Sequence, residues 1–174
     1  HGILPLHHHG DALGRNDRDT TWTAVISSDA ADQTDGISFH SYTIPTGKCD
    51  VKGAATVFSE ADWIATLVNT LKIDTLITDN VAKLDKNDPQ KKIGLFVDEW
   101  GTWYDVEKGT NAGFLFQQNT MRDAVVAALN FNIFHAHADR VRMTNIAQMV
   151  NVLQAMIITD KDKMVLTPTY HAYR

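Results

Sequence analysis

A short buried strand that ends in acidic residues constrains this chain more than any other feature. Ile93 to Val97 is an apolar, β-rich run, the pattern of a strand buried on both faces. It stops at Asp98 and Glu99, and Trp100 follows. Catalytic groups of barrel enzymes lie at the C-terminal ends of parallel strands, where a carboxylate can act as nucleophile or general base in glycosidic cleavage. A plain strand end with solvated acids and a core tryptophan fits equally well, so the rest of the chain must decide.

Helix and strand patterns alternate along the sequence. Helices are expected at residues 21–31, 59–84, 116–134 and 150–158, and strands at 36–42, 93–97 and 141–147, with a further extended segment at 164–167. Ser59 and Asp62 form the spacing of a capping box. The apolar face of the helix that follows is expected to comprise Trp63, Ile64, Leu67, Val68 and Leu71. The alternation predicts right-handed βαβ crossovers, and therefore an α/β fold with a parallel sheet.

Each of the three predicted strands ends in polar residues. These are His40 and Tyr42, then Asp98 and Glu99, then Asn145 and Gln148. Because parallel strands end at the same edge of a sheet, this pattern predicts one site at that edge.

Composition excludes several classes of function. The 174 residues carry a net charge of −5 with no basic stripe, so a nucleic-acid partner is not expected. No apolar stretch approaches the ~20 residues that span a bilayer, and no phosphate-binding glycine pattern opens a helix. We therefore expect no membrane partner and no nucleotide or other cofactor. Cys49 is the single cysteine, and no signal peptide is legible in residues 1–10, which favours a cytoplasmic location.

Three long motifs resemble glycoside hydrolase family 51, the α-L-arabinofuranosidases. They occur in order as DGISFHSYT at 35–43, IGLFVDEWGTWY at 93–104, and FHAHADRVRM at 134–143 running into NIAQMVNVL at 145–153. LTPTYH at 166–171 also resembles the family, which brings the likeness to about four fifths of the chain. The resemblance implies a partial (β/α)8 barrel, with strands six to eight and their helices at residues 35–163. Residues 1–34 would form an irregular leader with a short helix, and 164–174 an exit segment toward a β-sandwich.

The resemblance also implies roles for individual residues. Glu99 occupies the position of the catalytic nucleophile. Five further residues fall where the family contacts the sugar or the nucleophile: His40, Tyr42, Trp100, Trp103 and Gln148. The family has its acid/base glutamate in a Gly-Asn-Glu motif, which this sequence lacks, so the acid/base is unknown. Asp98 is expected to be a poor substitute, because neighbouring residues of a strand point to opposite faces.

A whole barrel needs about 250 residues. We therefore expect this chain to be a fragment or a truncated form that self-associates, or that pairs with the missing half of the barrel. The implied activity is retaining removal of α-L-arabinofuranosyl residues from arabinose-containing plant polysaccharides or oligosaccharides, such as hemicellulose and arabinan. Alternatives are a carbohydrate-binding remnant without turnover, and a relative that acts on xylosides or β-glucans. A metal site at His7 to His9, or at His135 and His137, is less expected, since the first run suits a tag and the second pair does not share a helix face.

Overall fold

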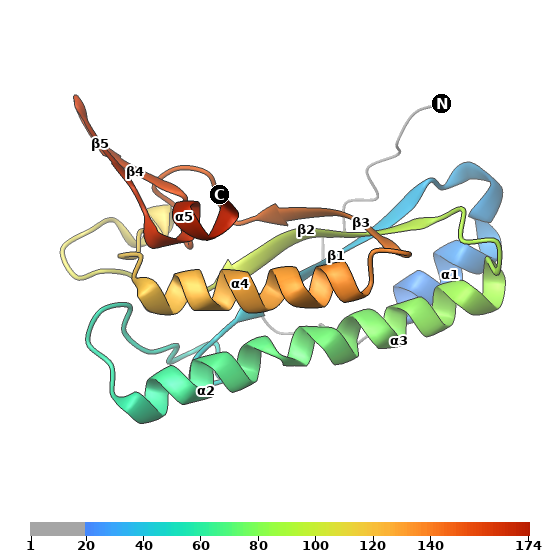
Figure 1. Ribbon diagram of the computed structural model, residues 1–174, viewed down its shortest axis with the longest axis horizontal. Helices are drawn as coiled ribbons and strands as arrows, with labels where there is room; N and C mark the ends of the chain where they lie inside the picture. The colour runs from blue at the N-terminus through green and yellow to red at the C-terminus, as the bar shows by residue number, and fades with distance from the viewer. Residues whose placement is uncertain (1–19) are drawn as a thin grey trace.

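The computed structural model describes residues 20–174, and all structural statements concern this part of the chain. Figure 1 shows its elements in order. The helices are α1 (Thr21–Asp29), α2 (Glu60–Thr70), α3 (Lys72–Asn87), α4 (Met121–Ala136) and α5 (Pro168–Tyr173), with short 3-10 turns at Ala31–Gln33 and Ala112–Phe114. The strands are β1 (Gly36–Thr43), β2 (Gly94–Thr102), β3 (Val141–Ile146), β4 (Ile157–Asp160) and β5 (Lys163–Leu166).

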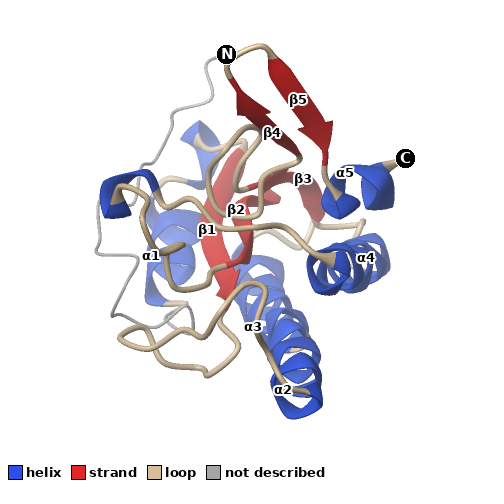
Figure 2. Ribbon diagram, turned by 90° about the vertical axis from the view of Figure 1, so that its left-hand side faces the viewer, coloured by secondary structure: helices blue, strands red, loops and turns tan. Residues whose placement is uncertain are grey.

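The main sheet is parallel, with strand order β1-β2-β3. The predicted α/β fold with a parallel sheet is therefore confirmed. Figure 2 shows α2, α3 and α4 on the same side of this sheet. Strands that follow one another in sequence order, with their helices on one face, form the arrangement found in a barrel wall. A doubly wound sheet would instead reverse its order and carry helices on both faces.

The hydrophobic core lies between this sheet and its helices. Ile37 of β1 and Leu95 and Val97 of β2 are fully buried there, because alternate residues of a strand share one face. Ile77 and Leu84 of α3 meet them from the helix side. The opposite face of the sheet is thereby left to the polar residues of the candidate site.

The predicted capping box at the start of α2 is confirmed. The Ser59 side chain accepts a hydrogen bond from the Asp62 N–H, and the Asp62 carboxylate accepts from the Ser59 N–H. Helices α2 and α3 then run almost in line, as Figure 1 shows, so helix extends to Asn87.

The predicted apolar face of α2 is wrong in part. Ile64, Val68 and Leu71 are each about half exposed, whereas Thr66 and Thr70 are buried. The two threonine hydroxyls donate to main-chain carbonyls one turn earlier, so their methyl groups can pack while their polar atoms are satisfied. The side of α2 that faces the sheet is therefore lined by threonine.

The helix expected at residues 150–158 is also wrong. Asn151 and Leu153 adopt positive φ values of 59° and 51°, which a right-handed helix does not tolerate. The Asn151 side chain instead bonds to the main chain of Thr159, accepting from its N–H and donating to its carbonyl. The chain continues into a β4–β5 hairpin that projects from the body in Figure 1.

The last segment folds back onto the molecule. Helix α5 packs against α4, and Tyr173 contacts Phe131 edge to face with ring centroids 4.6 Å apart. The boundary expected between residues 163 and 164 passes through the β4–β5 hairpin. No helix within residues 20–174 is both long and apolar enough to cross a membrane.

A buried guanidinium fastens the entry to β2. Arg140, fully buried just before β3, donates five hydrogen bonds, two of them to Asp85 and one each to the Asp88 carboxylate and to the carbonyls of Asp88 and Ile93. The Asp88 carboxylate also accepts from the Ile93 N–H at 2.7 Å. This cluster holds the α3–β2 turn, which precedes the strand carrying the acidic residues.

Candidate active site

A β-bulge in β2 creates the candidate site. Phe39 of β1 lies opposite Val97, but the next residue, His40, lies opposite Glu99. Asp98 is therefore the extra residue, so two residues of β2 face one residue of β1. The bulge places two successive acids beside the imidazole of His40.

The predicted nucleophile, Glu99, meets two residues of β1. Tyr42 Oη donates a hydrogen bond to Glu99 Oε2 at 2.5 Å, and His40 Nδ1 lies 3.4 Å from the same oxygen. Within the described residues, Glu99 Oε1 has no hydrogen-bond partner, and the side chain is 43% exposed. One carboxylate oxygen is thus held while the other remains available to a ligand.

Tyr42 is suited to donate a hydrogen bond to a carboxylate. Its burial raises the pKa of its hydroxyl far above the ordinary value, and the hydrogen bond and negative charge of Glu99 raise it further. The hydroxyl therefore stays protonated at every pH at which the protein would work.

Trp103 extends the site along the chain. Its ring packs against Tyr42 with centroids 5.0 Å apart at 66°, and the Lys52 ammonium lies 5.3 Å from its centroid. The main-chain N–H of Trp103 donates to the main-chain carbonyl of Thr43, which fixes the segment after β2 to the end of β1. The structure therefore brings His40, Tyr42, Glu99 and Trp103 together.

Trp100 does not line the site, and the expectation that it would is wrong. It is fully buried on the helix side of the sheet, against the rings of Phe131, Phe134 and Tyr173 at centroid distances of 5.6, 5.3 and 6.3 Å. Because the bulge shifts the alternation of β2, Glu99 faces the site and Trp100 faces the core.

Gln148 lies just beyond β3 and is exposed. Its N–H donates to the carbonyl of Val152, which closes a loop after the strand. Asn145, within β3, is also exposed. The geometry places Gln148 at the same edge of the sheet as Glu99, since parallel strands end there, but gives it no side-chain contact with the Glu99 cluster in the described part.

The second departure from expectation is Asp98. We expected its side chain on the face opposite Glu99, but Asp98 Oδ1 lies 3.4 Å from His40 Nε2 while Glu99 Oε2 lies 3.4 Å from His40 Nδ1. Both acids thus approach the same ring, because the bulge breaks the strict alternation on which the expectation depended.

Buried polar side chains support the backbone just beyond the acids. Gly101 has φ +142°, and the Gln154 carboxamide lies so close that a Cβ at this position would be 3.1 Å from its oxygen. The same oxygen accepts from the Thr102 N–H at 2.7 Å. Thr102 in turn donates its hydroxyl to the carboxylate of Asp123, whose pKa is raised by burial despite the hydrogen bonds that it accepts.

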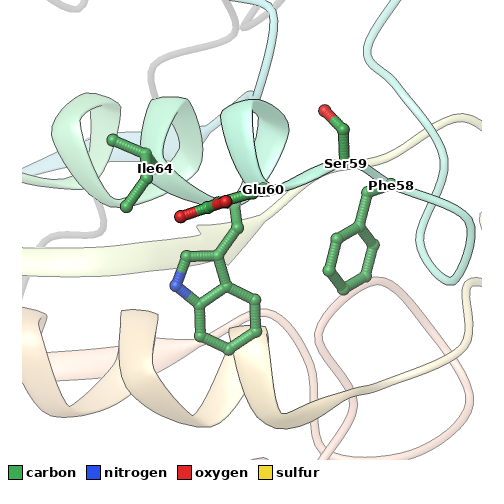
Figure 3. A pocket seen from close by; sticks show the side chains of 5 residues that line it. Phe58, Ser59, Glu60 and Ile64 are labelled. Atoms are coloured by element: carbon green, nitrogen blue, oxygen red, sulfur yellow. The ribbon is translucent and has the colours of Figure 1, made fainter.

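A shallow hollow of about 380 Å³ lies elsewhere, at the start of α2 (Figure 3). It is lined by Phe58, Ser59, Glu60, Trp63 and Ile64, with the Arg122 guanidinium 3.8 Å from the centroid of the Phe58 ring. None of the residues predicted for the site lines it. The residues of the candidate site therefore lie at the strand ends and not at this hollow.

The histidines that we considered for metal binding give no support to that alternative. His7 to His9 lie outside the described residues. His137 is the C-cap of α4 and pairs with Asp74 at 2.7 Å, while His135 is exposed two residues earlier, in the last turn of the helix. Within residues 20–174, no three His, Cys, Asp or Glu side chains cluster in a way that could hold a metal ion.

Two contributors were missed by sequence reasoning. Lys52 comes from the long loop after β1, and no pattern in the sequence indicates that it reaches Trp103. Asp98 was discounted on alternation, and a bulge leaves no reliable mark in a single sequence, because it depends on pairing with the neighbouring strand.

Comparison with known proteins supports the resemblance seen in the motifs. Residues 98–174 match the family model described as the α-L-arabinofuranosidase C-terminal domain. An intracellular exo-α-L-arabinofuranosidase of Bacteroides ovatus is 47% identical over 94% of this chain and 32% of its own length.

Solved structures agree. The crystal structure of a family 51 arabinofuranosidase from Xanthomonas axonopodis pv. citri superposes with a TM-score of 0.87 at 60% identity, over 91% of this chain and 32% of that protein. An α-L-arabinofuranosidase from Thermotoga maritima, solved with arabinose, superposes with a TM-score of 0.67 at 26% identity, over 90% and 29%. This chain is therefore similar to glycoside hydrolase family 51 α-L-arabinofuranosidases over more than nine tenths of its own length, and it spans about one third of the length of these relatives.

Proposed function

We propose that this chain carries the nucleophile side of the active site of a retaining exo-α-L-arabinofuranosidase. The substrates would be arabinose-containing plant polysaccharides or oligosaccharides, from which terminal α-L-arabinofuranosyl residues are removed. One observation carries the proposal: Glu99 has one oxygen held by Tyr42 beside His40, and the other open to a ligand. A carboxylate fixed in this way at the end of a parallel strand suits nucleophilic attack on an anomeric carbon.

In the proposed reaction, Glu99 Oε1 attacks the anomeric carbon and forms an ester bond. The bond to the leaving oxygen breaks with its electron pair, and a general acid gives that oxygen a proton. Water then attacks the anomeric carbon while the deprotonated acid takes a proton from it, and the bond from the anomeric carbon to Glu99 Oε1 breaks, which releases the sugar and returns the carboxylate. Tyr42, by donating to Oε2 throughout, keeps the carboxylate oriented.

The substrate would rest on the groups around Glu99. The Trp103 ring, placed beside Tyr42, offers a flat apolar surface to one face of the sugar. Gln148, exposed just beyond β3, offers an amide for the sugar hydroxyls. His40 lies beside the proposed nucleophile, with its Nδ1 3.4 Å from Glu99 Oε2.

The general acid is proposed to come from outside the described residues, because no second matched carboxylate stands at the family position. It would be supplied by barrel strands on the same or another chain, and these would also cover the inner face of the sheet, where Met143 is 40% exposed. Sedimentation of this chain at micromolar concentration tests the association. A monomer with no exposed apolar face by dye binding would contradict it.

An intracellular site of action is part of the proposal. It is supported by relatives such as the Bacteroides ovatus protein, whose name describes an intracellular enzyme.

The test is covalent trapping. A 2-fluoro arabinofuranoside with a dinitrophenolate leaving group needs no acid to depart, so it should label Glu99 even if the acid is absent. We expect the intact mass to rise by one fluoroarabinosyl group, with the modified peptide containing Glu99. Glu99→Gln should abolish labelling, because the amide that replaces the nucleophilic oxygen is a poor nucleophile.

Glu60→Gln is the matched control. It makes the same change at an exposed glutamate of α2 and should leave labelling intact. Equal labelling of wild type and Glu99→Gln would refute the assignment of the nucleophile. Arabinose-dependent shifts in NMR spectra without any label would favour the carbohydrate-binding alternative.

A further inference from the structure

We propose that Asp98 is a positioning residue for Glu99 and acts through the imidazole of His40. This inference rests on the proposed function, since it concerns the same carboxylate. It gives a purpose to the acid that the bulge inserts into β2, and it assigns a residue that the resemblance does not name.

The geometry is a chain of three side chains. Asp98 Oδ1 lies 3.4 Å from Nε2 of His40, and Glu99 Oε2 lies 3.4 Å from Nδ1 of the same ring. Asp98 Oδ1 is buried and makes no hydrogen bond within the described residues, although the side chain as a whole is 30% exposed. The His40 imidazole lies beside this oxygen and is the group through which Asp98 would act.

Two carboxylates at the two nitrogens of one imidazole favour its doubly protonated form, because each nitrogen then carries a proton toward an anion. A positive ring 3.4 Å from Oε2 attracts the Glu99 carboxylate and limits its rotation. The titratable groups of the described part that face His40 are Asp98 and Glu99 of β2 and Tyr42, two residues along β1. Tyr42 stays neutral, whereas Asp98 and Glu99 each place a carboxylate oxygen 3.4 Å from a ring nitrogen of His40.

The bulge makes this arrangement possible. Without it, successive side chains of β2 would alternate, and only one of the two acids would reach His40. With it, Asp98 and Glu99 both oppose His40, so the acid that does not react can influence the one that does.

The test follows the His40 ring by two-dimensional NMR of the uniformly 15N-labelled chain across pH 4 to 9. Wild-type His40 should show both ring nitrogens protonated at pH 6 and a titration midpoint above the ordinary value of about 6.5. Asp98→Asn keeps the shape and removes the charge, so the midpoint should fall by about 0.5 to 1 unit, the effect being moderated by partial exposure.

Asp74→Asn is the matched control. It removes the carboxylate that lies 2.7 Å from His137, on the helix layer, and should leave the His40 midpoint where it is. A shift of less than about 0.2 unit on Asp98→Asn, with the fold intact by amide spectra, would overturn the proposal. Should Asp98→Asn fail to fold, the wild-type measurement decides alone: a midpoint below the ordinary value would overturn it.

The trapping reaction separates this inference from the proposed function. If the proposal holds, the pH profile for labelling of Glu99 shifts in Asp98→Asn in step with the His40 midpoint, whereas a merely structural role would lower the rate equally at every pH. Labelling of Glu99 with an unmoved profile would overturn the role of Asp98 and leave the nucleophile in place. If the His40 midpoint shifts in Asp98→Asn but no variant is labelled, the proposed function is refuted, while the coupling between Asp98 and His40 is still supported.

Discussion

Replacing Arg140 with methionine should be among the most damaging single changes available outside the site. Methionine preserves an unbranched apolar stem but removes five donated hydrogen bonds. The groups that lose donors are the carboxylates of Asp88 and Asp85 and the carbonyls of Asp88 and Ile93. Arg140 is fully buried, so methionine leaves these groups facing an apolar side chain.

The expected loss in the free energy of unfolding depends on which of these groups are buried. Asp85 is exposed, so its share is about 0–1 kcal/mol. Asp88 is 7% exposed, and breaking a buried pair by removing one partner costs roughly 3–5 kcal/mol. Asp88 still accepts from the Ile93 N–H, and the Asp88 carbonyl still accepts from the Lys91 N–H, which limits the loss. We therefore expect a total near 3–5 kcal/mol and not the sum of all five bonds.

The loss of stability in Arg140→Met should become smaller as the pH falls. Burial acts to raise the pKa of Asp88, but the Ile93 N–H and the Arg140 guanidinium outweigh it and lower the pKa below the ordinary value. A carboxyl group with a lowered pKa in the folded state stabilises the fold above its unfolded pKa, near 3.9, and loses this effect as pH falls through the folded value. The difference between wild type and Arg140→Met should therefore shrink below about pH 4.

Urea unfolding, followed by tryptophan fluorescence and circular dichroism at pH 7 and pH 3.5, measures both effects. Arg140→Met combined with Asp88→Asn should recover part of the loss, since no unpaired charge is then buried. A loss under about 1 kcal/mol at pH 7 would refute the reasoning, as would an equal loss at both pH values.

Two further predictions concern β2. Gly101→Ala should destabilise the fold by about 1–3 kcal/mol in the same assay, because φ is +142° and the added Cβ would lie 3.1 Å from the Gln154 amide oxygen; an unchanged unfolding midpoint would contradict this. Trp100→Ala should cost about 3–5 kcal/mol because its ring is fully buried, whereas Trp103→Ala should cost clearly less stability but weaken trapping of the arabinofuranoside. Equal losses of stability for the two tryptophans would be inconsistent with their placement.

The strands and the long helix could be predicted because their signals are local. Apolar runs at residues 36–42, 93–97 and 141–147 correspond to β1, β2 and β3, and the Ala- and Val-rich stretch corresponds to α4. The long helix begins at Met121 and not at 116, since Thr120 and Asp123 form a capping box that fixes its start. That signal is present in the sequence.

The hairpin of β4 and β5 could not be predicted in the same way. The apolar residues between Val150 and Ile158 recur at a spacing that suits a helix as well as a strand. What decides is the left-handed conformation at Asn151 and the bonds that its side chain makes to Thr159, eight residues on. These depend on tertiary contacts, which a pattern of apolar residues does not carry.

The orientations of the residues in the candidate site also depend on tertiary contacts that the sequence pattern does not reveal. Val97 faces the helices, so strict alternation would point Asp98 to the site, bury the Glu99 carboxylate against the helices and leave Trp100 in the site. Burying an unpaired carboxylate costs several kcal/mol, and exposing an indole forfeits most of the gain from its burial. One bulge removes both penalties: Asp98 and Glu99 oppose His40 together, and Trp100 returns to the core. The same irregularity brings both acids beside His40 and buries Trp100, which explains why the expected orientations of Asp98 and Trp100 were wrong.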